Sequence, residues 1–263
     1  MKSSIGVILA SAVMLSGCVT IVPPKNEDDI AVKFEAEVAA LRDEARHHEA
    51  PGEAVDDLVL DGKRPVVFES LEMEDVRYVH DGAEEFSIEE INLELHRGEI
   101  VFLTGGNGSG KTTLLRVLCG LYPRLSGTLR WNGETLPVQP GQAYRDLFAA
   151  VFADVHLFDR PYGLDADGLA RFERWLEKLD VRHKLGADLS RLSCEALSTG
   201  QRKRVALALA LAEARPILVL DEWAADQDPQ TRARFYKEIL PELRAEGITV
   251  FAISHDEAYF GCC

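Results

Sequence analysis

The feature of this chain that most constrains its fold is a glycine-rich segment at residues 105–112, with the sequence GGNGSGKT. It fits the pattern G-x-x-x-x-G-K-[ST] in full, follows the apolar run 100–103 and precedes the helical stretch 113–118. Glycines let backbone N–H groups crowd around phosphate oxygens, and the positive end of a helix attracts the same anion. The segment therefore predicts a nucleotide-binding loop between a buried strand and a helix.

Two residues of this loop have specific predicted roles. Lys111 would reach the terminal phosphates of the nucleotide, and the Thr112 hydroxyl would bind Mg²⁺. A glycine-rich turn without a ligand is the alternative, and the strand–loop–helix setting argues against it. The other residues expected to surround the phosphates are Gly105, Asn107, Gly108, Ser109, Gly110 and Thr113.

A second candidate element follows the apolar run 217–220, which ends in two acidic residues. A carboxylate at the end of a buried strand is costly unless a metal ion or hydrogen bonds receive it. Beside a phosphate loop, Asp221 would hold Mg²⁺, and Glu222 would orient and deprotonate the attacking water. The alternative is a strand that simply reaches solvent, and the presence of the phosphate loop favours the catalytic interpretation.

Three further motifs occur in an order that resembles the ATP-binding cassette (ABC) ATPases. Residues 197–201, LSTGQ, are similar to the LSGGQ signature with Thr199 in place of a glycine, and Ser198 would cap the following helix. Residues 226–229, DQDP, resemble the D-loop, and residues 254–256, SHD, resemble the segment with the switch histidine. A helix cap alone would explain any Ser-x-Gly sequence, but ordered motifs are far more specific.

The resemblance covers residues from about 65 to 258 and implies a head-to-tail dimer with composite sites for ATP and Mg²⁺. In this arrangement the phosphate loop of one domain and the signature segment of a second ABC ATPase domain hold each ATP together. The residues it assigns are Lys111, Glu222 and His255 for catalysis, Tyr78 for stacking on adenine, Thr112 and Asp221 for Mg²⁺, Asp228 for the D-loop, and Ser198, Gly200 and Gln201 for the partner's ATP.

The expected fold class is α/β. The alternating elements expected are strands at 100–103, 217–220 and 248–253 and helices at 165–182 and 200–214. This alternation indicates a mostly parallel core sheet. The strand pattern at 91–95 and the Asn132-Gly133 hairpin signal add antiparallel pairs. The resemblance implies a P-loop NTPase core with an antiparallel β subdomain, plus a helical subdomain that carries the signature.

Finer sequence strings resemble a subfamily that exports cyclic peptides and siderophores; they are residues 102–110, 151–159, 197–204 and 221–229. In such transporters a six-helix membrane domain precedes the ATPase domain in one polypeptide, which works as a homodimer. The resemblance implies a small peptide or siderophore cargo and a bacterial inner membrane with the ATPase domain on its cytoplasmic face. One departure is Ala153, where the wider family has a Gln that contacts Mg²⁺, so that contact is missing or made by Asp154.

Three segments are expected along the chain: a hydrophobic segment at 1–24, an acidic linker helix at 25–62 and the ATPase domain at 63–263. The first is either the end of a transmembrane helix or a lipoprotein-like signal, since residues 15–18, LSGC, resemble a lipobox. We favour the helix, because a lipoprotein would lie outside the cytoplasm, where ATP is scarce. Almost all of the membrane domain expected before the ATPase domain is absent, and the chain stops soon after His255, so the resemblance implies truncation at both ends.

Charge restricts the expected partners. The formal net charge is −15, and almost all of the acidic excess lies within residues 27–90. A nucleic-acid-binding protein would need a basic face, so no nucleic acid partner is expected. The expected function is ATP hydrolysis that drives export across the inner membrane. The alternatives are a soluble ABC ATPase outside transport, and a truncated or lipoprotein-like remnant that keeps a nucleotide fold.

Overall fold

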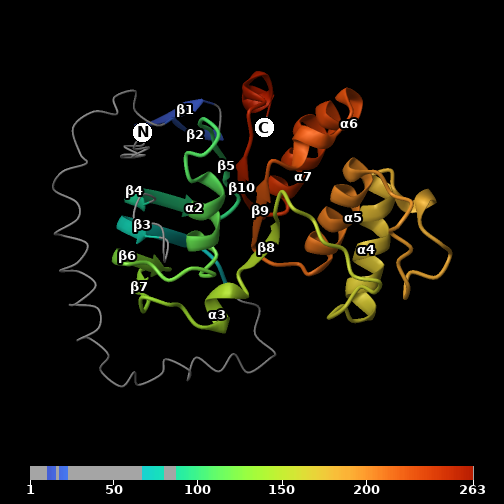
Figure 1. Cartoon of the computed structure of the whole chain (residues 1–263), viewed down its shortest axis with the longest axis horizontal. Helices are drawn as coiled ribbons and strands as arrows, with labels where there is room; N and C mark the ends of the chain where they lie inside the picture. The colour runs from blue at the N-terminus through green and yellow to red at the C-terminus, as the bar shows by residue number, and fades with distance from the viewer. Residues whose placement is uncertain (1–10, 16–17, 23–66, 80–86, 263) are drawn as a thin grey trace. The chain divides into compact units, whose positions relative to one another are not determined.

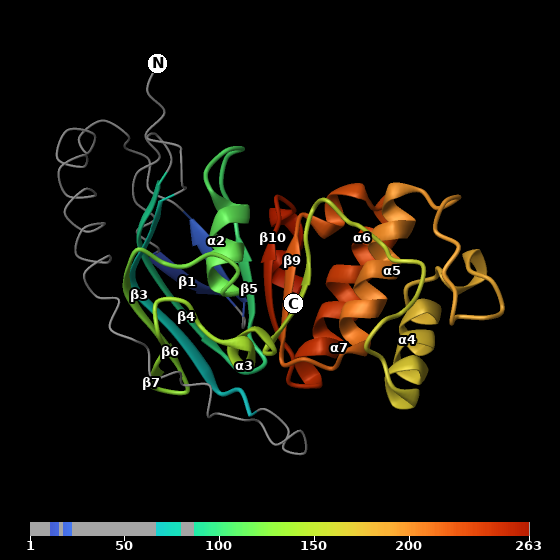
Figure 2. The same cartoon turned by 60° about the horizontal axis from the view of Figure 1, so that its bottom comes forward.

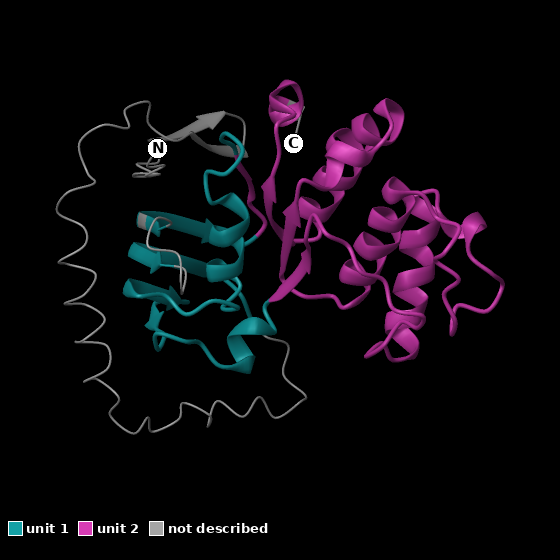
Figure 3. Cartoon of the chain, viewed as in Figure 1, with its two compact units in different colours: residues 1–13, 20–97, 104–147 teal, residues 14–19, 98–103, 148–263 magenta. Residues whose placement is uncertain are grey.

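A computed structural model describes residues 11–15, 18–22, 67–79 and 87–262 of the 263-residue chain (Figure 1). The chain divides into two compact units (Figure 3). Unit 1 comprises residues 1–13, 20–97 and 104–147, and unit 2 comprises residues 14–19, 98–103 and 148–263. The phosphate loop therefore belongs to unit 1, whereas the acidic pair at 221–222 and the signature segment belong to unit 2.

Unit 1 contains a four-stranded antiparallel sheet with the strand order β4-β3-β6-β7. Its strands are β3 (Ser70–Val79), β4 (Ser87–His96), β6 (Ser126–Trp131) and β7 (Glu134–Thr135). Its helices are α2 (Lys111–Leu118) and α3 (Gln142–Arg145). This sheet is the antiparallel subdomain that the sequence predicts.

The local sequence explains two features of this sheet. In β4, Ile91, Leu93 and Leu95 are buried while the residues between them are exposed, as a period of two requires for a half-buried strand. Between β6 and β7, Asn132 and Gly133 take positive φ values of 50° and 81°. Two consecutive residues of this conformation make the tight turn whose twist matches the flanking strands, so this hairpin prediction is confirmed.

Unit 2 is built on four parallel strands: β5 (Ile100–Leu103), β8 (Phe148–Val151), β9 (Ile217–Asp221) and β10 (Thr249–Ile253). They belong to a six-stranded sheet with the order β1-β2-β5-β10-β9-β8. Every residue of β5, β9 and β10 is buried, as in parallel strands covered on both faces. Asp221 of β9 lies opposite Ile253 of β10, so the carboxyl ends of these neighbouring strands meet at one edge.

The helices of unit 2 are α4 (Ala166–Lys178), α5 (Thr199–Ala212), α6 (Pro229–Arg234) and α7 (Leu240–Ala245), with a π-helical turn at Phe235–Ile239 and 3₁₀ turns at Arg182–Lys184, Trp223–Asp226 and Glu257–Cys262. Helix α4 packs against α5, as Figures 1 and 2 both show. Helix α4 ends at Lys178 rather than at residue 182, because Asp180 takes a left-handed φ of 51° that stops the helix.

A single apolar core holds unit 2 together. Trp175 and Phe172 of α4 pack in it with Phe102 of β5 and with Trp223, which follows β9. All four side chains are almost completely buried, and each such aromatic contributes a large apolar area. This core supports the C-terminal ends of β9 and β10 and the N-terminal end of α5. The predicted site residues of this unit lie at these ends.

The described parts of the hydrophobic N-terminal segment are strands, whereas the sequence analysis favours the end of a transmembrane helix there. They are β1 (Ser11–Leu15) and β2 (Cys18–Val22). Within the described ranges, no helix has both the length and the apolar character needed to cross a membrane. The linker helix expected at 25–62 lies outside the described residues.

Candidate active site

The phosphate loop of unit 1 has a backbone conformation that requires its glycines. Gly105, Gly108 and Gly110 take φ values of 150°, 79° and 83°, which L side chains rarely adopt. Gly110 is also the N-cap residue of α2, and it supplies no side-chain cap to the N-terminal end of this helix. The loop therefore presents a positive helix end and open backbone to an anion.

Lys111 lies within this loop, where the prediction needs it. Its side chain is buried, and its Nζ donates hydrogen bonds to the carbonyl oxygens of Gly105 and Gly106, both at 2.8 Å. A buried ammonium group needs such acceptors, because desolvation would otherwise be costly. Phosphate oxygens are stronger, charge-assisted acceptors for the same donor. The loop thus holds a cation ready for a nucleotide phosphate.

Oxygen atoms suited to Mg²⁺ are present in each unit. Thr112 is half-buried in the first turn of α2, and Asp221 is 2% exposed at the end of β9. Mg²⁺ prefers oxygen ligands and usually keeps waters and substrate phosphates, so it does not need an all-protein cage. In the described part of the chain, no group of three or more His, Cys, Asp or Glu residues could hold a metal ion. The Thr112 hydroxyl in unit 1 and the Asp221 carboxylate in unit 2 are each an oxygen ligand of the kind that Mg²⁺ prefers.

Tyr78, the predicted adenine-stacking residue, is buried in β3. Its ring stacks on that of Tyr122, with the ring centroids 5.2 Å apart and the planes 10° apart. Arg116 lies over the Tyr122 ring at 5.6 Å from its centroid, and donates from Nη1 to the Tyr122 hydroxyl at 2.8 Å. Stacking of Tyr78 on adenine stays a prediction. It would require that the adenine ring reach an accessible face of one of these two aromatic rings.

In unit 2, the ends of β9 and β10 bring Glu222 and His255 together. The His255 Nε2 atom lies 3.5 Å from the Glu222 Oε1 atom, and both side chains are partly open to solvent. Glu222 takes a left-handed conformation with φ 50° and ψ 37°, and its N–H donates to the carbonyl of Ile253 at 3.2 Å. For a non-glycine residue this conformation costs about 1–3 kcal/mol, so surrounding contacts must hold it.

The signature segment begins α5 with a complete capping box. The Gln201 N–H donates to Ser198 Oγ at 3.3 Å, and the Ser198 N–H donates to Gln201 Oε1 at 3.0 Å. A Cβ placed on Gly200 would lie 2.5 Å from the carbonyl oxygen of Asp226. Glycine is therefore required at this position because the D-loop backbone approaches it closely. Thr199, which replaces a family glycine, is exposed at the first turn.

A buried lysine connects the signature helix to the acidic segment. Lys203 of α5 donates to the carbonyl oxygen of Glu222 at 2.9 Å and forms an ion pair with Asp226 at 2.7 Å. The Trp223 indole N–H donates to the Lys203 carbonyl at 2.8 Å, and Gln227 Nε2 donates to the Gly200 carbonyl at 3.1 Å. Four contacts thus join the first turns of α5 to residues 222–227.

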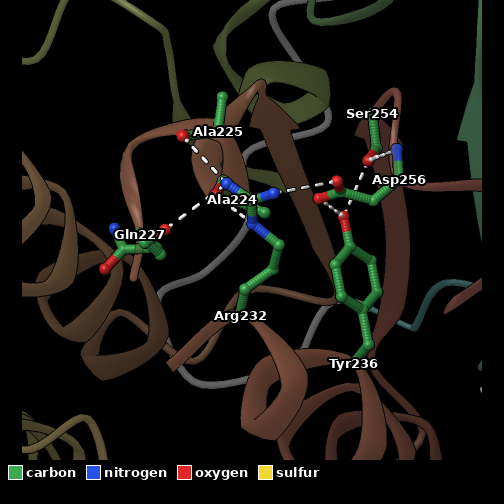
Figure 4. A network of polar contacts seen from close by, with 7 residues as sticks. All are labelled: Ala224, Ala225, Gln227, Arg232, Tyr236, Ser254 and Asp256. Atoms are coloured by element: carbon green, nitrogen blue, oxygen red, sulfur yellow. Dashed lines mark hydrogen bonds and ion pairs between the residues drawn. The ribbon is translucent and has the colours of Figure 1, made fainter. Parts of the chain in front are cut away.

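A second cation holds the same loop from the side of α6 (Figure 4). Arg232 donates to the carbonyl oxygens of Ala224, Ala225 and Gln227 at 3.2, 3.1 and 3.4 Å. It also pairs with Asp256 at 3.3 Å. This arginine therefore ties the D-loop backbone to the residue that directly follows His255.

Two hydroxyl groups complete this network (Figure 4). The Tyr236 hydroxyl donates to Asp256 Oδ2 at 3.1 Å and lies 2.7 Å from Ser254 Oγ. Ser254 Oγ accepts the N–H of Asp256 at 3.0 Å. The segment around His255 is consequently fixed on both sides by buried or half-buried polar groups.

Asp228, the predicted D-loop residue, serves as the N-cap of α6. Its carboxylate accepts the N–H groups of Gln230 and Thr231 at 3.1 and 3.0 Å, and the Thr231 hydroxyl at 2.7 Å. The hydrogen bonds from Thr231 lower the pKa of this carboxyl below its usual value. The group is therefore an anion at neutral pH and helps fix the start of the helix.

The sequence motifs identify the main candidate site residues but not the residues that connect them. Lys203 sits in the run Arg202-Lys203-Arg204, which looks like a solvated basic start of a helix. Its burial places it on the inner face, a fact that depends on the rotation of α5 against the rest of unit 2. Arg232 and Asp256 carry no motif of their own, and only the position of each beside a motif could have drawn attention to them.

Comparison with known proteins identifies the family. Residues 88–225 match the family model described as ABC transporter. The chain is 44% identical over 179 residues to the ATP-binding protein SyrD of Pseudomonas syringae pv. syringae, a match that covers 66% of this chain and 32% of SyrD. It is 33% identical over 183 residues to a putative ABC transporter ATP-binding protein of Geobacter sulfurreducens, covering 64% of each. The chain thus spans less than two thirds of either relative.

Solved structures agree with this assignment. CbiO1 from Clostridium perfringens, part of the ABC transporter complex CbiONQ, matches with a TM-score of 0.59 and 27% identity, over 73% of this chain and 81% of that chain. A bacterial Atm1-family ABC exporter with ATP bound shares the fold, with a TM-score of 0.63 at 24% identity, over 74% of this chain and 36% of that chain. The chain belongs to the ABC transporter family and carries its ATPase domain, so the predicted family and the α/β P-loop fold class are confirmed.

Proposed function

We propose that this ABC ATPase domain hydrolyses ATP with Mg²⁺ in a head-to-tail dimer and thereby drives export of a small peptide or siderophore across a bacterial inner membrane. The observation that carries hydrolysis is the pair Glu222 and His255, 3.5 Å apart at the ends of neighbouring parallel strands. A carboxylate held beside an imidazole at the end of a strand is suited to activate water.

Each group of the site has one task in the proposed reaction. Lys111 and the backbone of the phosphate loop bind the terminal phosphates, and Mg²⁺ held by Thr112 and Asp221 would offset their negative charge. Glu222 accepts the proton of the attacking water, while His255 keeps the carboxylate oriented. Positioning and electrostatics therefore supply the rate enhancement, as is usual for phosphoryl transfer.

The dimer is proposed from the family resemblance and from the state of the signature segment. Ser198 is exposed to solvent. Gly200 and Gln201, in the first turn of α5, are half-exposed. Helix α5 is 14 residues long, and its N-terminal end has the partial positive charge that favours an anion. A partner's ATP would meet this end, so each site would need residues from two domains.

Contact with a membrane domain is supported by an aromatic surface that follows β8. Phe158 and Tyr162 are 62% and 65% exposed. The Phe158 ring makes edge contacts with His156 and Tyr162, at centroid distances of 5.2 and 5.9 Å. Exposed apolar side chains that gather in this way mark interaction sites. The surface follows Ala153 and Asp154 in the chain. In the wider family, a Gln at the position of Ala153 couples nucleotide binding to the membrane domain.

Replacing the proposed base tests hydrolysis directly. We expect Glu222→Gln to lower kcat for ATP at least 100-fold while ATP still binds, because only proton transfer to the carboxylate is lost. The control is Glu246→Gln, an exposed glutamate at the end of α7. Turnover is measured by phosphate release and binding by fluorescence of a labelled ATP. Normal turnover in Glu222→Gln would show that another group is the base.

Export is tested in the producing cell. A strain with Glu222→Gln in the full-length transporter should retain its peptide or siderophore inside the cell, as measured by mass spectrometry of cells and medium. The Glu246→Gln strain should secrete it normally. Unchanged secretion in Glu222→Gln, together with lost ATP turnover in vitro, would separate the ATPase from export and leave only the enzyme part of the proposal.

A further inference from the structure

We infer that Lys203 is a positioning residue through which the signature helix sets the conformation of the catalytic Glu222 in the same chain. This inference rests on the proposed function, since it concerns the geometry of the proposed base. It adds a residue that lies after the signature residues 197–201 and that the motifs assign no role. Three features of unit 2 support it: a buried charge, a strained backbone and a close backbone approach.

The first observation is the burial of the lysine. The Lys203 side chain is 3% exposed, and lysine is almost never buried to this degree unless it is paired. Its Nζ has two acceptors, the Glu222 carbonyl oxygen at 2.9 Å and the Asp226 carboxylate at 2.7 Å. Both acceptors belong to the short loop that begins with Glu222. The ammonium group of Lys203 therefore interacts with this loop instead of with solvent.

The second observation is what the lysine holds in place. Glu222 has the left-handed φ of 50°, which a non-glycine residue keeps only when its surroundings determine it. Its N–H is bonded to the Ile253 carbonyl, and its C=O is bonded to Lys203. Both backbone polar groups of Glu222 are thus fixed, one by β10 and one by α5. The direction of its side chain toward His255 follows from this backbone.

The third observation connects the lysine to the signature segment. Lys203 lies less than one helical turn after Gly200, on the same rigid helix. Gly200 is pressed against the Asp226 carbonyl, and its own carbonyl accepts the Gln227 side chain. A displacement of the signature segment would therefore move Lys203 and, through it, both ends of residues 222–226. In the proposed dimer this connects a contact with the partner's ATP to the base at this chain's own ATP.

The experiment uses the full chain with Lys203→Met, which keeps the volume of the side chain but removes the charge. We expect kcat for ATP to fall at least tenfold while KM and the ATP dissociation constant change less than twofold. Lys203→Arg, which keeps the charge, should recover a substantial part of kcat. The matched control is Lys178→Met, a half-buried lysine of α4 whose ion pair with Glu242 involves neither the signature segment nor residues 222–227.

A second variant addresses the other end of the contact and guards against a folding defect. Asp226→Asn leaves Lys203 in place and changes a side chain that is 44% exposed, so the fold should persist. If Lys203 acts through this loop, the double variant should lose less activity than the product of the two single losses. Independent losses that multiply, or a lower thermal midpoint with kcat unchanged, would mean that the lysine only stabilises the fold.

A measurement without turnover separates this inference from the proposed function. Hydrogen exchange of peptides covering residues 222–228 should be faster in Lys203→Met than in the wild type, with peptides from α4 unchanged. If the wild type fails to hydrolyse ATP, the proposed function is wrong, and the exchange result still decides whether Lys203 holds the loop. Unchanged exchange in this segment would overturn the inference.

Discussion

The candidate site residues of unit 1 and those of unit 2 are held in place in different ways. In unit 1, the phosphate loop draws its groups from consecutive residues, and Lys111 finds its acceptors five and six positions earlier in the chain. In unit 2, the proposed catalytic pair depends on contacts from α5, α6, β9 and β10, with partners 18 to 33 positions apart. The proposed phosphate contacts therefore come from one short segment, whereas tertiary packing positions the proposed catalytic pair.

The largest effect expected from this contrast concerns the phosphate loop. Lys111→Ala removes the one buried ammonium of the loop and should weaken ATP binding by about 3 kcal/mol, or about 100-fold in Kd. Labelled-ATP fluorescence measures this affinity. Lys184→Ala, which changes an exposed lysine of unit 2, is the control. Equal affinities for the two variants would mean that the loop binds nucleotide through its backbone alone.

The close approach of Gly200 to the D-loop predicts an intermediate effect. In Gly200→Ala the new Cβ would meet the Asp226 carbonyl at 2.5 Å, so the backbones must separate at a cost of about 1–3 kcal/mol in the free energy of unfolding. We expect a lower thermal midpoint and reduced kcat with ATP affinity preserved. Gly186→Ala, where a Cβ meets no atom within 4 Å, should match the wild type.

One outcome would contradict this expectation. If Gly200→Ala and Gly186→Ala had the same thermal midpoint and the same kcat, the signature segment and the D-loop would not be in contact in solution. Thermal unfolding followed by circular dichroism and phosphate release at saturating ATP provide the two readouts.

The smallest effect expected is that of Arg232→Met. Arg232 is partly exposed, so solvent can replace some of its contacts with the D-loop carbonyls and with Asp256. We expect kcat to fall about 3- to 10-fold, equivalent to about 1 kcal/mol in the activation free energy, with ATP affinity unchanged. The control is Arg234→Met on the same helix, since among the described residues the ion pair of Arg234 is with Glu238. A change in ATP affinity rather than kcat would contradict the division of tasks between the two units.

Much of the fold follows from the sequence, for identifiable reasons. The apolar runs of β5, β9 and β10 are buried on both faces, and such runs are recognisable without any partner. The β6–β7 hairpin is predictable because Asn132 and Gly133 accept the positive φ values that the turn needs. The end of α4 is less predictable, because Asp180 can take either a helical or a left-handed conformation until tertiary contacts choose between them.

The candidate site divides in the same way. The motifs locate Lys111, Thr112, Asp221, Glu222 and His255, because their chemistry requires fixed residue types at fixed spacings. The pairing of Glu222 with His255 also follows once β9 and β10 are known to be parallel neighbours. The stack of Tyr78 on Tyr122 does not follow, because the two rings come from separate segments of unit 1 and either could have faced solvent.

The sequence by itself determined that this chain is an ABC ATPase domain with a phosphate loop able to hold a nucleotide, because eight consecutive residues carry the required backbone freedom and charge. Only the tertiary structure decided which cations hold the segment that follows β9. Lys203 and Arg232 look like ordinary surface charges in the sequence, yet packing turns one inward against Glu222 and Asp226 and places the other across the D-loop carbonyls. The physical reason is that burial and rotation of a helix depend on its neighbours, which no local pattern contains.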